Sequence, residues 1–262
     1  MTVLASVYRL FQRPMRLLLL LCLVLPAAAF GQQADPRAAR LVDNWIKAAG
    51  GPGIWDRVHT LQYTITTVWY DSTGAEVRRR PRYVRIKKIP GGFRVRVART
   101  EAVGDYVQSL DGTKVWATLN GTLLPDSARA VREVPYVAGD LVYWMGLPWK
   151  LKDPGVNLVY VEPSAVHVSF EGGVGLHDGD RYWHYWADRQ AAFPSHVEYI
   201  EQGKNENDRE RVIWSEWTRF GPAVYAAQRR LVEVATGRLL RAFLISDVKV
   251  NEKLPDSLFR QP

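Results

Sequence analysis

The sequence is poor in cysteine, and its single cysteine, Cys22, lies near the N-terminus. Cys22 stands within a run of nine apolar residues, 17–25. That run is too short to span a bilayer core, which needs about 20 residues. Leu21 precedes Cys22 where a lipidated bacterial signal has a small residue, so we do not expect lipidation. If this segment is removed, the remaining chain has no disulfide, thiolate nucleophile or cysteine-based zinc site.

Acidic residues are absent from positions 1–31, which carry Arg9, Arg13 and Arg16 before the apolar run and Pro26 with small alanines after it. This order is typical of a secretory signal. We therefore predict that residues 1–31 are a cleaved signal peptide and that the mature chain is a soluble periplasmic protein. Without those three arginines, the chain keeps 32 of its 35 basic residues against 27 acidic ones. The net charge falls from +8 to about +5, which does not indicate a nucleic-acid partner.

Catalytic motifs are missing as well. The sequence has no Gly-x-Ser-x-Gly elbow, no P-loop and no dinucleotide fingerprint before a helix. His177, Asp178, Asp180 and His184 lie within eight residues, but their spacing matches no zinc motif such as His-Glu-x-x-His. We therefore predict that the protein is not an enzyme and uses no cofactor or metal. A hydrolase built around His177, Asp180 and His184 is the least favoured alternative.

One amphipathic helix is predicted at the start of the mature chain. Asp35 can cap it, Pro36 suits its first turn, and apolar residues recur at helical spacing up to Ala49. The pair Gly50-Gly51 then ends the helix.

From Leu61 onward the apolar pattern has a period of two, which is typical of β-strands. Asp111-Gly112 and Asn120-Gly121 are strong hairpin turns. Residues 122–151 interrupt this pattern with an irregular helical stretch, broken at Pro135 and Gly139, which we expect to act as a lid or plug.

The predicted fold is mainly β. We expect residues 32–262 to form one domain: a single large, curved antiparallel sheet of roughly ten to twelve strands, shaped as a half-barrel. The N-terminal helix and the insert at about 122–151 are expected to lie against its concave face, because an amphipathic helix must bury its apolar side.

Three stretches of the sequence resemble a known group of bacterial proteins. They are 48–51 (Ala-Ala-Gly-Gly) with Ile54-Trp55, 148–158 (PWKLKDPGVNL), and 248–251 (VKVN) with the apolar residues that follow. The chain resembles the periplasmic lipoprotein carriers of the LolA/LolB-like fold, and more closely an uncharacterised family of outer-membrane lipoprotein-sorting-like proteins. The resemblance implies an apolar concavity that holds acyl chains, and it implies no catalytic residues.

Aromatic and aliphatic side chains are the candidates for that concavity. We predict that the cavity is lined by Trp45, Tyr63, Ile65, Trp69, Trp144, Trp149 and Trp214. Aromatic residues in a β-protein also pack in cores and across strands, and this alternative stays open.

Basic residues crowd between positions 78 and 99, with no acid among them. We predict that Arg80, Arg82, Arg94 and Arg96 form one positive face that binds an anionic membrane surface or an acidic partner. The alternative is a solvated face of the sheet.

The leading hypothesis is a monomeric periplasmic carrier that binds a lipid or a lipoprotein acyl chain in the half-barrel. The first alternative is an envelope interaction module whose own residues 122–151 fill the cavity, and the second is the hydrolase named above.

Overall fold

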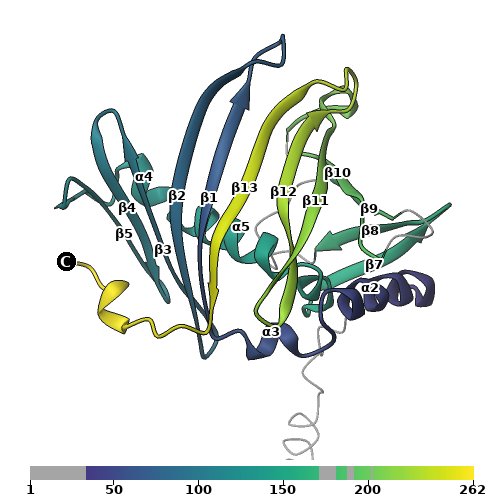
Figure 1. Cartoon of the computed structure of the whole chain (residues 1–262), viewed down its shortest axis with the longest axis horizontal. Coiled ribbons are helices and arrows are strands. Elements are labelled where there is room, and N and C mark those ends of the chain that lie inside the picture. The colour runs from purple at the N-terminus through teal and green to yellow at the C-terminus, as the bar shows by residue number, and fades with distance from the viewer. Residues whose placement is uncertain (1–33, 171–180, 188–191, 202) are drawn as a thin grey trace, which may run out of the picture. The chain divides into compact units, whose positions relative to one another are not determined.

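The computed structural model describes residues 34–170, 181–187, 192–201 and 203–262, so the predicted signal peptide lies outside the described residues (Figure 1). The strands are β1 Thr60–Tyr70, β2 Glu76–Ile89, β3 Gly92–Glu101, β4 Gly104–Asp111, β5 Lys114–Leu119, β6 Thr122–Leu123, β7 Val156–Val161, β8 Ala165–Phe170, β9 Arg181–Trp186, β10 His196–Ile200, β11 Glu210–Phe220, β12 Ala223–Glu233 and β13 Leu239–Val250. The helices are α2 Pro36–Ala48, α3 Ile54–Arg57, α4 Arg129–Arg132 and α5 Val134–Gly146, with 3-10 turns η2 Trp149–Lys152, η3 Glu206–Asp208 and η4 Asp256–Leu258.

Among the described residues, the strands form one 13-stranded sheet in the order β6-β5-β4-β3-β2-β1-β13-β12-β11-β10-β9-β8-β7. Every pair of neighbouring strands is antiparallel. The sheet is open, because β6 and β7 are its two edges. The prediction of a single antiparallel half-barrel is confirmed, with 13 strands instead of ten to twelve. Strand β6 has two residues, too few to show a period in the sequence.

Alternating burial gives the sheet one apolar face. On β1, Leu61, Tyr63 and Ile65 are buried, and the residues between them are more exposed. Ile65 lies directly opposite Arg82 on β2 and Ile245 on β13. Residues directly opposite each other in adjacent strands point to the same side of a sheet, so Arg82 lies on this apolar face.

Helix α5 shows that the apolar face is concave. The helix has 13 residues and is therefore about 20 Å long. It contacts β4 and β5 at one end of the sheet, while its Tyr143 and Trp144 pack on Trp183 of β9 near the other end. In a flat sheet the eight steps from β4 to β9 would span about 38 Å. The sheet must therefore curve around α5, as Figure 1 shows.

The buried side of α5 follows a helical stripe of Val134, Ala138, Leu141, Val142 and Met145. The prediction that residues 122–151 are interrupted at Pro135 and Gly139 is wrong for this helix. Pro135 lies in its first turn, where no backbone N–H is needed, and the helix continues through Gly139. No helix in the described part of the chain has the length and apolar character needed to cross a membrane.

Helix α2 packs at one edge of the sheet, against β7 and β8. The Asp35 carboxylate accepts a hydrogen bond from the Arg37 N–H at 2.7 Å, which is the predicted N-cap. The Asp35 N–H donates to the Leu158 carbonyl of β7 at 2.9 Å. Residues Ala38, Val42, Trp45 and Ile46 are buried beneath the helix. The middle of the concave face is therefore covered by α5, and α2 covers only the β7 edge.

Candidate functional site

The concave face and α5 enclose a cavity of about 350 Å³, which we call the polar cavity. Its wall is formed by α5, by the paired strands β1, β2 and β13, and by β9 to β12. Ionisable side chains are unusually frequent in this wall: Arg80, Arg82, Lys204, Arg229 and Arg241, with Asp140, Glu201 and Glu210. Aromatic rings form much of the remainder, among them those of Trp69, Trp144 and Phe243.

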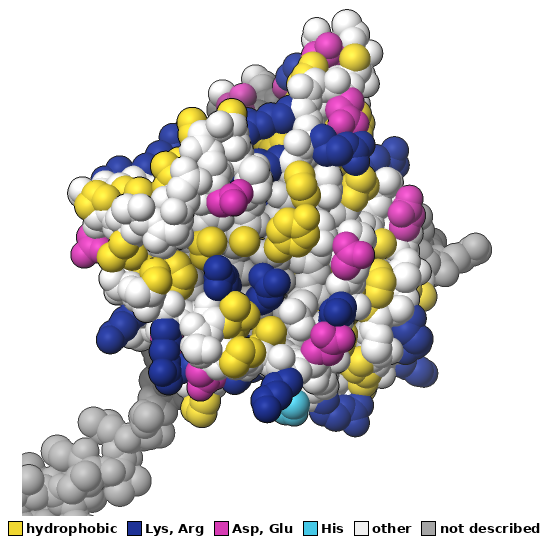
Figure 2. All heavy atoms as spheres, turned by 60° about the vertical axis from the view of Figure 1, so that its left-hand side comes forward, with side chains coloured by type: hydrophobic (Ala, Val, Ile, Leu, Met, Phe, Trp, Pro, Cys, Tyr) yellow, Lys and Arg dark blue, Asp and Glu magenta, His cyan; other side chains and the backbone are white. Residues whose placement is uncertain are grey.

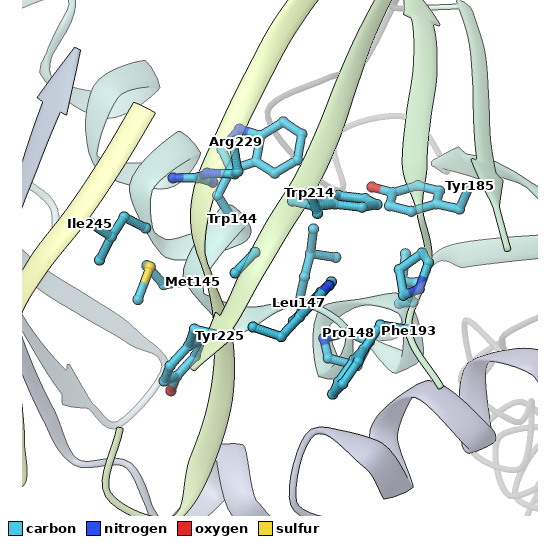
Figure 3. A pocket seen from close by; sticks show the side chains of 14 residues that line it. Trp144, Met145, Leu147, Pro148, Tyr185, Phe193, Trp214, Tyr225, Arg229 and Ile245 are labelled. Atoms are coloured by element: carbon cyan, nitrogen blue, oxygen red, sulfur yellow. The ribbon is translucent and has the colours of Figure 1, made fainter. Parts of the chain in front are cut away.

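A second and much smaller space lies beside the first, with a volume of about 30 Å³, and we call it the apolar cavity (Figure 3). Its wall is almost entirely apolar, with Trp214 and Tyr185 on the sheet and Met145 and Leu147 at the end of α5. Trp144 and Arg229 line both cavities. A volume of 30 Å³ holds about two water molecules at most, so an acyl chain fits there only if α5 moves.

Arg229 on β12 is the most buried charged group of the site, with 5% of its surface exposed. Its guanidinium carbon lies 5.2 Å from the ring centre of Trp144 and 5.9 Å from that of Phe243. Among the described residues its Nε atom has no hydrogen-bond partner. Burial lowers the pKa of Arg229 from its ordinary value, because the charged form is desolvated.

Arg82 on β2 is the second arginine in this part of the polar cavity, and its side chain is half-buried. Its Nε atom is likewise buried without a hydrogen-bond partner in the described residues. Burial also lowers the pKa of Arg82, and the nearby carboxylate of Asp140 acts in the opposite direction. The charges of Arg229 and Arg82 both act on the Tyr63 hydroxyl, which is buried without a hydrogen-bond partner among the described residues.

The acidic groups of the polar cavity already have partners of their own. The Asp140 carboxylate accepts from the Trp144 indole N–H at 2.7 Å. Glu210 accepts from the Tyr199 hydroxyl at 2.8 Å, and burial raises its pKa. Five basic side chains face three acidic ones in this wall, so the cavity has an excess of positive charge.

The predicted cavity residues separate into three groups. Ile65, Trp69 and Trp144 line the polar cavity, and Trp144 and Trp214 line the apolar one. Tyr63 is buried next to Arg82 and Arg229.

Trp45 and Trp149 are placed differently and pack in the core. Trp45 belongs to the buried side of α2. Trp149 stacks on Trp55 with a centroid distance of 6.5 Å, and its indole N–H donates to the Gly51 carbonyl at 2.9 Å. These two tryptophans pack in the core and line neither cavity.

The four arginines predicted to share one positive face lie on opposite faces of the sheet. Arg80 and Arg82 line the polar cavity on the concave side. Arg96 pairs across the strands with Arg85, three positions from Arg82, so it points to the convex side. Figure 2 shows basic side chains scattered among acidic and apolar ones, without a continuous basic patch in that view.

The C-terminal segment covers Arg94 and Arg96. An Arg94 nitrogen lies 2.8 Å from the Asp256 carboxylate, and Arg96 donates to the Leu258 carbonyl at 3.1 Å. Asp256 also accepts from Lys87 at 2.6 Å. The basic residues of this part of the convex face are thus occupied by the chain's own tail.

The histidines do not form a site in the described residues. His177, Asp178 and Asp180 lie outside them, and the described residues contain no group of three potential metal ligands. His184 lies on the convex face against His167, with ring centroids 4.9 Å apart.

His184 should make the fold sensitive to acid. Burial and the charge of His167 lower the pKa of His184 to about 4, while Glu198 raises it and Arg209 lowers it. The unfolded chain binds this proton near pH 6.5, so stability is lost as pH falls from about 6.5 to 4. We expect His184→Gln to lose less stability than the wild type between pH 7.5 and 4.5, measured by urea unfolding. Exposed His59→Gln is the control, and an unchanged pH slope in His184→Gln would contradict the expectation.

Sequence reasoning missed that Arg82 and Arg229 line a cavity on the concave face. It placed Arg82 on an outer surface and did not single out Arg229. The available signal is an arginine at a position that points to the apolar face of a strand. Arg82 shares its face of β2 with buried Val84 and Ile86, and Arg229 shares its face of β12 with buried Leu231.

Comparison with known proteins shows a likeness in structure only. No family model matches the sequence, and no curated protein matches it. A domain assigned to outer membrane lipoprotein sorting from Vibrio parahaemolyticus has 10% identity and a TM-score of 0.51, covering 85% of this chain and 95% of that one. A DUF1329 family protein from Desulfovibrio piger has 9% identity and a TM-score of 0.51, covering 86% and 98%. A LolA superfamily protein from Nitrosomonas europaea has 10% identity and a TM-score of 0.50, covering 87% and 99%. The chain therefore has a LolA-like fold, as the sequence resemblance predicted.

Proposed function

We propose that this protein is a periplasmic carrier that holds the apolar chain of a lipid or lipoprotein between α5 and the concave face of the half-barrel. The observation that carries the proposal is an open sheet with an aromatic concave face, whose middle is covered by α5 beside a 350 Å³ cavity. Pockets for small ligands have volumes of about 300–1,000 Å³ and combine apolar walls with a few polar groups.

Helix α5 is the proposed gate. Its Tyr143 hydroxyl meets the Tyr185 hydroxyl of β9 at 2.5 Å, and its Trp144 packs on Trp183 and Trp214. An acyl chain that displaces these contacts makes apolar contacts of its own. Each CH₂ group that it buries stabilises the bound state by about 0.8 kcal/mol. A chain of ten or so methylenes therefore supplies several kcal/mol toward moving α5.

The predicted signal peptide and the LolA-like fold support the periplasmic location. The fold also supports binding over catalysis, because the structures it is similar to include a domain assigned to lipoprotein sorting. The polar cavity holds no convergent set of acid and histidine side chains among the described residues that would favour the hydrolase.

The self-filled interaction module stays as a second candidate. The observation that favours it is the small apolar cavity, since the α5 side chains already occupy most of the apolar concavity. The two candidates differ in whether an apolar molecule can displace α5.

Uptake of the uncharged fluorophore N-phenyl-1-naphthylamine tests the proposal. We expect saturable binding to the wild type, and about tenfold weaker binding to Ala226→Leu, because the added methyl groups fill the apolar cavity that Ala226 lines. Ala98→Leu, on the convex face, is the matched control and should bind as the wild type does.

Mass spectrometry of organic extracts from protein purified from cell envelopes provides the second readout. Co-purifying lipid supports the carrier. No fluorophore uptake together with no extracted lipid would overturn it and favour the self-filled module.

A further inference from the structure

We propose that Arg82 and Arg229 bind the anionic head of an amphiphile, a carboxylate or phosphate group, while its apolar tail lies between α5 and the sheet. This inference rests on the proposed function and adds the class of ligand. It starts from two guanidinium groups that face one cavity from strands β2 and β12.

The first step is the cost of burying these charges. Arg229 has 5% of its surface exposed, and in the described residues neither its guanidinium nor that of Arg82 has an ion pair within 4 Å. An ionised side chain without a partner is strongly disfavoured inside a protein. The two arginines also repel each other, because the charge of Arg82 acts on Arg229 and lowers its pKa. A bound anion would remove both penalties at once.

The second step concerns the acids that could have served as partners. Asp140 is the acid that acts on both arginines, and its Oδ1 atom already accepts from Trp144. Glu210 is engaged by Tyr199 and is disfavoured as a charged group by burial. One carboxylate therefore faces two guanidinium groups, which leaves a positive excess for an anion to fill.

The third step places the tail. Arg229 and Trp144 line both cavities, so a group bound at Arg229 lies at the boundary between the polar and apolar walls. Figure 3 shows Arg229 beside Trp144, with the apolar side chains Met145 and Ile245 nearby. A molecule with one anionic end and one apolar chain fits a polar wall that adjoins an apolar one. Guanidinium groups suit such a head, since they bind carboxylate and phosphate oxygens in a fork.

The experiment compares 11-(dansylamino)undecanoic acid with its methyl ester, which differ in one negative charge. We expect the wild type to bind the acid about tenfold more tightly than the ester, because a charge-assisted hydrogen bond is stronger than a neutral one. Arg229→Met and Arg82→Met should bind the two probes with nearly equal affinity. Arg96→Met is the matched control: it is a half-buried arginine on the convex face, and it should keep the preference for the acid.

Binding of the ester shows that each variant has a folded pocket, so loss of the preference is separate from loss of the fold. If a methionine variant does not fold, Arg229→Lys and Arg82→Lys keep the charge and should reduce the preference only in part. Equal binding of acid and ester by the wild type would overturn the anion site and leave the proposed function standing. Binding of neither probe would overturn the proposed function itself.

Competition distinguishes the sources of the anion. Dodecanoate and dodecyl phosphate should displace the dansyl acid, and inorganic phosphate at the same concentration should not. Displacement by inorganic phosphate as strong as that by dodecyl phosphate would show a site for a free anion and overturn the role of the tail.

Discussion

Phe259→Ala is expected to lower the free energy of unfolding by about 3–5 kcal/mol, the usual cost of removing a fully buried phenylalanine ring. The ring is 0% exposed, although only three residues of the sequence follow it. It is buried against the convex side of the sheet rather than in the half-barrel. The substitution therefore tests whether the tail is part of the fold.

The contacts of the tail explain why the loss should be large. The Phe259 carbonyl accepts hydrogen bonds from the Trp116 indole N–H at 2.9 Å and from the Ser109 hydroxyl at 3.2 Å. Both donors belong to buried side chains. Lys87 and Arg94 hold the Asp256 carboxylate and lower its pKa to about 2. Releasing the tail would expose these groups together.

Urea unfolding followed by tryptophan fluorescence measures the effect. Exposed Arg260→Ala is the control and should be within about 0.5 kcal/mol of the wild type, as surface substitutions usually are. A loss of less than about 1 kcal/mol in Phe259→Ala would show that the tail is not needed for stability.

Structural elements that are determined by residues close together in the sequence could be predicted from it. The helix at 36–48 begins where Asp35 caps it. The hairpin at Asn120-Gly121 forms because both residues adopt positive φ, at 51° and 79°, as a tight two-residue turn requires. The period of two that begins at Leu61 correctly predicted a strand there, since the side chains of a strand alternate between its two faces.

The faces of paired strands could not be predicted in the same way. Arg80 and Arg82 belong to β2, and Arg94 and Arg96 to β3, so their common orientation depends on the register between the strands. A register shift by one residue moves a whole strand pattern to the other face. The observed register pairs Arg85 with Arg96, which separates the four arginines into two pairs.

The sequence also could not show which tryptophans line a cavity, because an apolar side chain suits the core and a cavity wall equally well. Trp144 and Trp149 stand five residues apart, yet Trp144 lines both cavities and Trp149 stacks on Trp55. The difference arises where α5 ends at Gly146 and the chain turns into η2. Such a turn in three dimensions leaves no periodic signal.

Arg229→Met is expected to raise the free energy of unfolding by about 1–4 kcal/mol, the range found when apolar residues of similar volume replace buried ion pairs. The substitution gives up cation–π contacts with Trp144 and Phe243, worth about 0.5–2 kcal/mol. It removes the desolvation of a guanidinium that has no ion pair among the described residues, and its repulsion with Arg82. The second effect should be larger, because the methionine side chain still packs on both rings.

Arg211→Met is the matched control with the opposite sign. Arg211 donates to Glu198 at 2.8 Å, and the Glu198 carboxylate is buried, so its loss leaves a buried anion with a weaker set of partners. Urea unfolding should therefore show a stabilised Arg229→Met and a destabilised Arg211→Met. A fall in stability for Arg229→Met would mean that the protein's own residues balance the charge of Arg229 and that no ligand is needed to balance it. A rise in stability together with a lost preference for the anionic probe would show that the arginine is kept for binding at a cost to the fold, which is the usual relation between a binding site and stability.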